Sequence, residues 1–251
     1  MKLKLFAATA ALLMGFAPVS QADETIAIKA GFMILSPSGD FGATVNNIGT
    51  RIDLEKDLNF DNSTQAIGEI DINLGDSLIS FGFTPLSFKG SGILNRPINY
   101  NGQLFAAGTA ASSEFKADLY DFSYTYYVIN MDDLPSRFQL GLETSVKTFN
   151  AKTSVTGSGL TASKSTTIAI PTAGLRGRVA LADFIGVSGR FGYLGYAGNF
   201  FTDASAQIEF SPLPLLGINA GYRYLKVKLD TNGLLADVTF KGPFAELFFR
   251  F

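Results

Sequence analysis

The chain ends in FAELFFRF, residues 244–251, in which two kinds of side chain alternate. Successive side chains of a β-strand point to opposite faces, so this stretch predicts a strand with one apolar face and one charged face. Glu246 and Arg250 lie on the charged face. Phe244 and Phe248 also fall there, where the alternation gives them no role. The apolar face carries Ala245, Leu247, Phe249 and Phe251.

The same period of two recurs along the chain from Thr25 onward, and helix signals are almost absent. Counting these segments predicts an all-β chain of ten antiparallel strands. Eight strands remain the alternative, if the segment at 203–210 or a terminal strand is misassigned. The alternating segments are 25–35, 65–74, 79–84, 120–128, 137–147, 169–179, 187–193, 203–210, 218–224 and 245–251.

The connections between these segments alternate between short and long. Short turns on one side and long loops on the other are typical of up-and-down barrels in bacterial outer membranes, where the turns face the periplasm. An even number of strands then places both termini on the turn side. The expected short turns are 75–76, 130–136, 182–184 and 211–216. The expected loops are 36–63, 89–113, 150–166, 197–202 and 230–234.

The N-terminus has the pattern of a secretory signal. Two lysines precede an apolar stretch from Leu5 to Phe16, Pro18 interrupts it, and Ser20–Ala22 supplies small residues for a signal peptidase. This stretch is shorter than the roughly 20 residues that a membrane-spanning helix requires, which argues against an uncleaved anchor. We expect a cleaved signal peptide at 1–22 and one barrel domain at 23–251, exported to the outer membrane of a Gram-negative bacterium.

Alternation alone does not say which face points inward. The charged face carries both signs strand after strand, and the apolar face has tyrosine and phenylalanine near strand ends, as an interfacial girdle would. We therefore predict a transmembrane barrel with a charged lumen rather than a soluble β-sandwich, since closure also leaves no strand edge unpaired in lipid. The predicted lumen-lining residues are Lys29, Glu69, Asp71, Asp121, Glu143, Lys147, Arg176, Arg178, Arg190, Glu209, Arg223, Glu246 and Arg250.

Five stretches of the chain carry a family resemblance: IGTRIDLEKDLNFD (48–61), DLYDFSYTYY (118–127), LRGRVALAD (175–183), GYRYLKVKLD (221–230) and FKGPFAELFFRF (240–251). They resemble small bacterial outer-membrane β-barrel proteins, the group of OmpW-like and OmpA-transmembrane-type barrels. The resemblance implies contact with outer-membrane lipids and lipopolysaccharide. It also implies that the barrel-assembly machinery recognises the C-terminal strand through Leu247, Phe249 and Phe251.

The composition argues against several classes of function. The chain has no cysteine and no histidine, so thiolate chemistry is excluded and the commonest general base and metal ligand are missing. Without Lys2 and Lys4, 18 basic residues face 22 acidic ones, which does not suit nucleic acid. We expect no catalytic residues, no cofactor and no metal site, and hence no enzyme.

Two pairs of residues and one acidic segment could suggest catalysis or calcium binding. Asp121 with Ser123, or Ser145 with Lys147, share a strand face, but such pairs arise by chance in any polar lumen. The acidic segment lacks the glycine-centred loop of a calcium motif and is better explained as a solvated charged face. It comprises Asp53, Glu55, Asp57 and Asp61.

The sequence leaves two functions open. One is a non-enzymatic barrel whose lumen charges pair with one another. Its role is then structural, or it binds an unknown ligand at the cell surface through its loops. The other is a porin-like, narrow passive pore for small solutes. A lumen of mixed sign favours the first, because unpaired buried charge is costly. If the charges alone close the lumen, Arg176→Ala/Arg178→Ala should conduct ions.

Overall fold

The computed structural model describes residues 25–43, 49–131, 137–213, 215–231 and 234–251. These residues form thirteen β-strands, and none of them belongs to a helix that could cross a membrane. The predicted signal peptide lies outside the described residues, so its cleavage stays a prediction.

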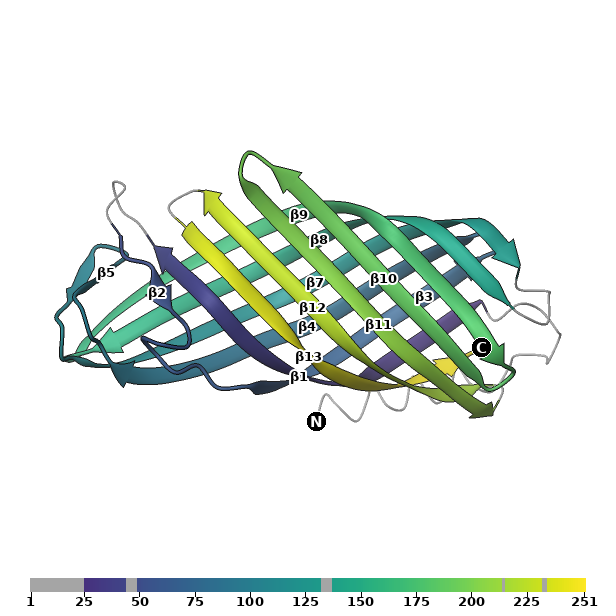
Figure 1. Cartoon of the computed structure of the whole chain (residues 1–251), viewed down its shortest axis with the longest axis horizontal. Helices are drawn as coiled ribbons and strands as arrows, with labels where there is room; N and C mark the ends of the chain where they lie inside the picture. The colour runs from purple at the N-terminus through teal and green to yellow at the C-terminus, as the bar shows by residue number, and fades with distance from the viewer. Residues whose placement is uncertain (1–24, 44–48, 132–136, 214, 232–233) are drawn as a thin grey trace, which may run out of the picture.

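Ten long strands pair antiparallel with their neighbours, and the last pairs with the first, which closes a barrel (Figure 1). The prediction of ten strands is confirmed, and the alternative of eight is wrong. The barrel strands are β1 (Ile26–Ala43), β3 (Ser63–Leu74), β4 (Ser77–Ile93), β7 (Ala110–Met131), β8 (Phe138–Gly157), β9 (Leu160–Ala182), β10 (Ile185–Tyr196), β11 (Asn199–Leu213), β12 (Leu216–Thr231) and β13 (Leu234–Arg250).

Several strands are much longer than a membrane requires. Strand β7 has 22 residues, β8 has 20 and β9 has 23, whereas about 9–11 tilted residues suffice to cross a bilayer. The predicted loop at 150–166 is therefore wrong, because β8 and β9 run through it and meet at a two-residue turn. Ser158 and Gly159 in that turn have φ of 52° and 76°, as a type I′ hairpin turn requires.

The predicted loop at 197–202 is wrong for the same reason. Strands β10 and β11 meet at Ala197 and Gly198, with φ of 50° and 79°. The predicted loops at 36–63 and 89–113 hold real connections but are shorter than expected, and they contain three small strands. Strand β2 (Ile52–Asp53) pairs with β1, and β5 (Ile98–Tyr100) forms a hairpin with β6 (Gln103–Phe105).

The opposite end of the barrel carries the short turns and both ends of the described chain (Figure 1). Strands β3 and β4 are joined by Gly75 and Asp76 alone. The backbone amide of Ile26 donates to the carbonyl of Phe251 at 3.0 Å, and the amide of Phe251 donates to the carbonyl of Ile26 at 2.9 Å. We call this end the turn side and the other end the loop side. Residues 132–136 and 214, within two predicted turns, are outside the described residues.

The outer wall near the turn side is apolar. Phe32, Phe122 and Leu247 expose 65%, 52% and 58% of their surface. In a water-soluble barrel such side chains would point inward, whereas here they form a continuous outer band that only lipid can cover. The chain is a transmembrane barrel. Other exposed apolar residues of this band include Ile28, Ile34, Ile70, Phe81, Phe83, Tyr124, Tyr126, Leu142, Val146, Leu175, Phe191, Tyr193, Ile208, Ile218 and Tyr222.

The interior of the loop-side half is apolar, which the alternation did not predict. Rings from β4, β7 and β13 meet there: Phe88 stacks on Phe240 with centroids 5.1 Å apart, and Phe115 lies 5.6 Å from Phe240. Segments between the strands fold over this core as a cap, which buries Leu58 and Tyr100 completely. We refer to this interior cluster as the apolar core.

Candidate functional site: the charged lumen

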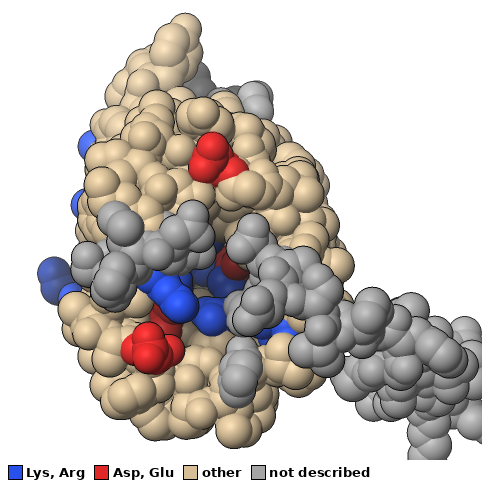
Figure 2. Space-filling model, turned by 90° about the vertical axis from the view of Figure 1, so that its right-hand side faces the viewer, with Lys and Arg blue, Asp and Glu red and all other residues tan. Residues whose placement is uncertain are grey.

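A cavity of about 1110 Å³ occupies the turn-side half of the barrel. Its mouth is at the end that carries Gly75 and Asp76, where basic side chains are visible inside the opening (Figure 2). Towards the loop side it ends at Met33 and Leu119, which belong to the apolar core. The cavity is therefore blind, because side chains fill the interior beyond it.

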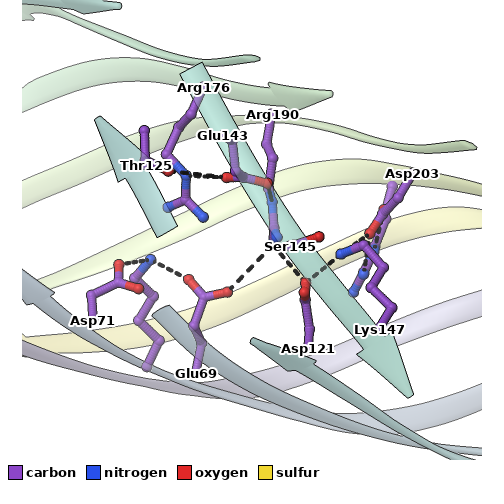
Figure 3. Close-up of polar contacts among 12 residues, drawn as sticks. Glu69, Asp71, Asp121, Thr125, Glu143, Ser145, Lys147, Arg176, Arg190 and Asp203 are labelled. Atoms are coloured by element: carbon purple, nitrogen blue, oxygen red, sulfur yellow. Dashed lines mark hydrogen bonds and ion pairs between the residues drawn. The ribbon is translucent and has the colours of Figure 1, made fainter. Parts of the chain in front are cut away.

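Arg190 on β10 lies at the centre of the charges in this cavity (Figure 3). It reaches across the barrel to Asp121 on β7, 2.8 Å away, and contacts Glu143 on β8 at 2.6 Å. Its remaining contact, with Glu69 on β3, is longer at 4.0 Å. Arg176 on β9 binds the second oxygen of Glu143 at 2.9 Å. One guanidinium thus joins carboxylates from three strands.

Lys147 on β8 extends this network toward the far wall. Its ammonium group lies 2.5 Å from Asp121 and 2.9 Å from Asp203, and its side chain is only 1% exposed. Asp203 on β11 also accepts two hydrogen bonds from Arg223, at 2.9 and 2.7 Å. This two-point geometry suits a planar guanidinium and is stronger than a single contact.

Lys29 on β1 completes the network on the other side. Its ammonium group lies 2.7 Å from both Glu69 and Asp71 of the neighbouring strand β3. The connected set holds five basic and five acidic groups, so its formal charges cancel. Its members are Lys29, Lys147, Arg176, Arg190 and Arg223 with Glu69, Asp71, Asp121, Glu143 and Asp203.

A smaller cluster lies nearer the mouth. Glu209 contacts Arg178 at 2.8 Å and Arg250 at 3.5 Å, while Glu246 accepts a hydrogen bond from Asn219 at 2.8 Å. These four charged groups are again two of each sign. In the part of the chain that the structure describes, the lumen charges are mixed in sign and form no ring of one charge, which an ion-selective filter would need.

Eleven of the thirteen predicted lumen residues line the cavity. The other two, Glu143 and Lys147, are buried in the wall behind it as members of the ion-pair network. Sequence reasoning missed Asp203, which joins Lys147 to Arg223. The same alternation could have predicted its position, because Asp203 and Glu209 lie on the same face of one strand.

Phe244 and Phe248 point into the lumen and pack over glycines of β12. Their register partners are Gly221 and Gly217. A Cβ atom added to Gly217 would lie 2.2 Å from the ring of Phe248, and one on Gly221 would lie 2.7 Å from the ring of Phe244. Gly217 and Gly221 therefore make room for aromatic rings. The guanidinium carbon of Arg250 also lies 4.3 Å from the centroid of the Phe248 ring.

The two pairs weighed for catalysis are not arranged as dyads. Ser145 pairs with Thr172 at 2.6 Å instead of Lys147, and Asp121 is held by Lys147 and Arg190. In the acidic segment, Asp53 and Asp57 accept hydrogen bonds from backbone amides. Among the described residues, no group of three or more potential ligands could hold a metal ion.

A scan against protein-family models finds no match, and a search of curated proteins finds none. Solved structures that resemble the chain are small outer-membrane β-barrels. The translocator domain of autotransporter NalP from Neisseria meningitidis is 12% identical, with a TM-score of 0.47, over 100% of this chain and 95% of that one. The transport unit of autotransporter AIDA-I from Escherichia coli is 12% identical, with a TM-score of 0.47, over 98% and 97%. Ail, the attachment invasion locus protein of Yersinia pestis, is 12% identical, with a TM-score of 0.39, over 91% and 99%. The likeness concerns general architecture, and the fold described above rests on the strand pairing itself.

Proposed function

We propose that this chain is a non-enzymatic, non-conducting barrel of the outer membrane that acts at the cell surface through its loop-side wall and cap. The observation that carries the proposal is the apolar core, which fills the lumen beyond a blind, ion-paired cavity. Placement in the outer membrane is supported by the apolar outer band and by short turns opposite long extensions. The predicted lipid and lipopolysaccharide contacts follow from that placement.

Two barriers in series support the non-conducting role. The first is the charge network, in which each ion is held by a partner of opposite sign. The second is the apolar core, where Phe88 and Phe240 are 2% and 4% exposed. An ion entering such a closely packed region would lose its hydration without gaining a partner of opposite charge, at a cost of several kcal/mol. A passive pore would need both barriers to open.

Contacts between the cap and the barrel wall support a defined surface on the loop side. The cap hairpin is tied to the wall by the Tyr100 hydroxyl, which pairs with the Thr153 hydroxyl of β8. Burial raises the pKa of Tyr100 to about 12, so this phenol stays protonated over the physiological range. Arg51 also forms an ion pair with Asp40 of β1.

Conductance of the refolded protein in a planar bilayer tests the closed lumen. We expect no resolvable single-channel current from the wild type. The variant Arg176→Ala/Arg178→Ala should also be silent, because the apolar core is untouched in it. Steady current through the wild type would overturn the non-conducting role and favour the pore. Current through the variant alone would mean that the charges, and not the core, close the lumen.

Thiol labelling in cells tests which end of the cavity is open. The chain has no cysteine, so Ser205→Cys, on the cavity wall, and Thr161→Cys, exposed on the loop side, each provide one reactive group. A membrane-impermeant maleimide added to intact cells should label Thr161→Cys and spare Ser205→Cys. Permeabilising the outer membrane should then allow Ser205→Cys to react.

The two labelling sites also check orientation. Equal labelling of Ser205→Cys in intact cells would mean that the lumen is open from outside. Failure of Thr161→Cys to react in intact, expressing cells would place the loop side in the periplasm. Either result contradicts one stated part of the proposal.

A further inference from the structure

Basic side chains lie on both sides of the barrel wall. Six arginines and Lys29 line the cavity and Lys147 is buried behind it, whereas six other lysines lie on the outward faces of β4, β7, β8, β12 and β13. The outward direction follows from the alternation; Lys226, for example, flanks the buried Leu225. These outward lysines are Lys89, Lys116, Lys152, Lys226, Lys228 and Lys241.

All six lie on the loop side of the apolar band. On β12 the outward residues from Leu216 to Tyr224 are apolar, and Lys226 and Lys228 follow directly. This nine-residue stretch is the length that crosses a bilayer at barrel tilt. At the turn-side border, the described strands carry no outward lysine or arginine. The positive charge therefore faces one leaflet only.

Three of these lysines form a patch on the outer wall of β11–β13, which we call the lysine patch. The ammonium groups of Lys226 and Lys228 lie 5.4 and 5.8 Å from the centroid of the same ring, Phe200. Lys241 sits beside them, opposite Tyr224 in the β12–β13 register. The patch comprises Lys226, Lys228, Lys241 and Phe200.

The lysine patch has more positive than negative charge. Asp237 is the carboxylate within ion-pair distance, 3.6 Å from Lys226. Among the described residues, no acidic group lies within that distance of Lys228 or Lys241. Asp237 also lies opposite Lys228 in the β12–β13 register, so this one carboxylate faces three ammonium groups, and the patch keeps a positive charge that suits an anion.

We infer that the lysine patch binds the phosphate groups of a lipid in the loop-side leaflet, of the diphosphorylated lipid A type. The acyl chains of such a lipid would lie against the outward apolar residues of β11–β13, directly below the lysines. Its phosphates would meet the ammonium groups at the border, where charge-assisted hydrogen bonds are strong. The inference rests on the proposed outer-membrane placement, with the loop side outward.

The test measures binding of diphosphorylated lipid A to the refolded full chain in zwitterionic detergent, by native mass spectrometry. The triple variant Lys226→Gln/Lys228→Gln/Lys241→Gln should lower the affinity about tenfold or more. A charge-matched control, Lys56→Gln/Lys89→Gln/Lys152→Gln, should lower it much less. The triple Lys→Arg variant of the patch should retain binding, and inorganic phosphate should compete only weakly.

Each outcome decides the inference. Equal losses in the two glutamine variants, or no loss in the patch variant, would overturn the site. Equal binding of dephosphorylated lipid A would also overturn it. Heat-dependent gel mobility shows whether each variant is still a closed barrel. A patch that fails this test while the wild type stays electrically silent would leave the proposed function standing.

Discussion

Replacing Arg190 by leucine is expected to lower the free energy of unfolding by about 3–5 kcal/mol. The substitution removes the cation that contacts Asp121 and Glu143 from across the barrel. Five acidic groups of the network then face four basic ones, and the excess negative charge stays buried. The measurement is a urea titration in phospholipid vesicles, followed by gel mobility because the chain has no tryptophan.

Two variants sharpen this test. Arg137→Leu removes a guanidinium at the exposed cavity mouth and should change stability by no more than about 0.5 kcal/mol. Arg190→Leu/Asp121→Leu removes one charge of each sign and should recover part of the loss, since Lys147 still pairs with Asp203. Similar losses for Arg190→Leu and Arg137→Leu would show that the network carries no special stability.

Deleting Phe251 is expected to reduce the amount of closed barrel in the outer membrane about tenfold. Such a factor corresponds to a loss of about 1.4 kcal/mol of contact free energy. Phe251 exchanges two backbone hydrogen bonds with Ile26 where the first and last strands meet. Its ring is half exposed on the outer wall, beside Phe249 at 5.8 Å. The measurement is the heat-modifiable fraction in isolated outer membranes.

The control for this deletion is Phe251→Tyr, which keeps both backbone bonds and an aromatic ring. It should assemble at a yield near that of the wild type. We also propose that Leu247, Phe249 and Phe251 are read by the barrel-assembly machinery. Phe251→Gly separates the two effects, because it keeps the backbone bonds and removes the ring. If deleting Phe251 left the yield of closed barrel unchanged, that would contradict both the role of its backbone bonds and the recognition of its ring.

The membrane-facing part of the fold was predictable because its chemistry alternates residue by residue. Phe122 and Tyr124 face lipid while Asp121 and Ser123 face the lumen, so one sequence pattern gives strand, face and register. The ten strands followed from counting such segments.

The loop-side half was not predictable in the same way. Beyond the membrane, the outer face of β8 and β9 meets water and becomes polar, while small residues such as Ala151 and Ala162 point inward. The contrast between faces then fades, and threonine- and serine-rich stretches resemble loops although they are good strand formers. The predicted loop at 150–166 failed for this reason.

The charged lumen was only partly predictable from the sequence. The alternation identified thirteen of the charged lumen residues but not their ion-pair partners. Arg190, for example, contacts Asp121 and Glu69, which lie three or more strands away in the sheet. The apolar core was missed for a related reason. Phe88 and Phe115 are partners on adjacent strands, but Phe240 comes from the last strand, and only closure of the barrel brings it onto them.

The cross-barrel ion pairs also bear on how the chain can fold. Glu69 and Arg190 are 121 positions apart, and Asp121 and Arg190 are 69 apart. A half-formed sheet in the bilayer would leave these charges facing hydrocarbon, at about 2–4 kcal/mol for each basic group near the midplane. Partly inserted species are thereby disfavoured. Insertion should be a concerted, slow event, governed by long-range contacts rather than by addition of one hairpin at a time.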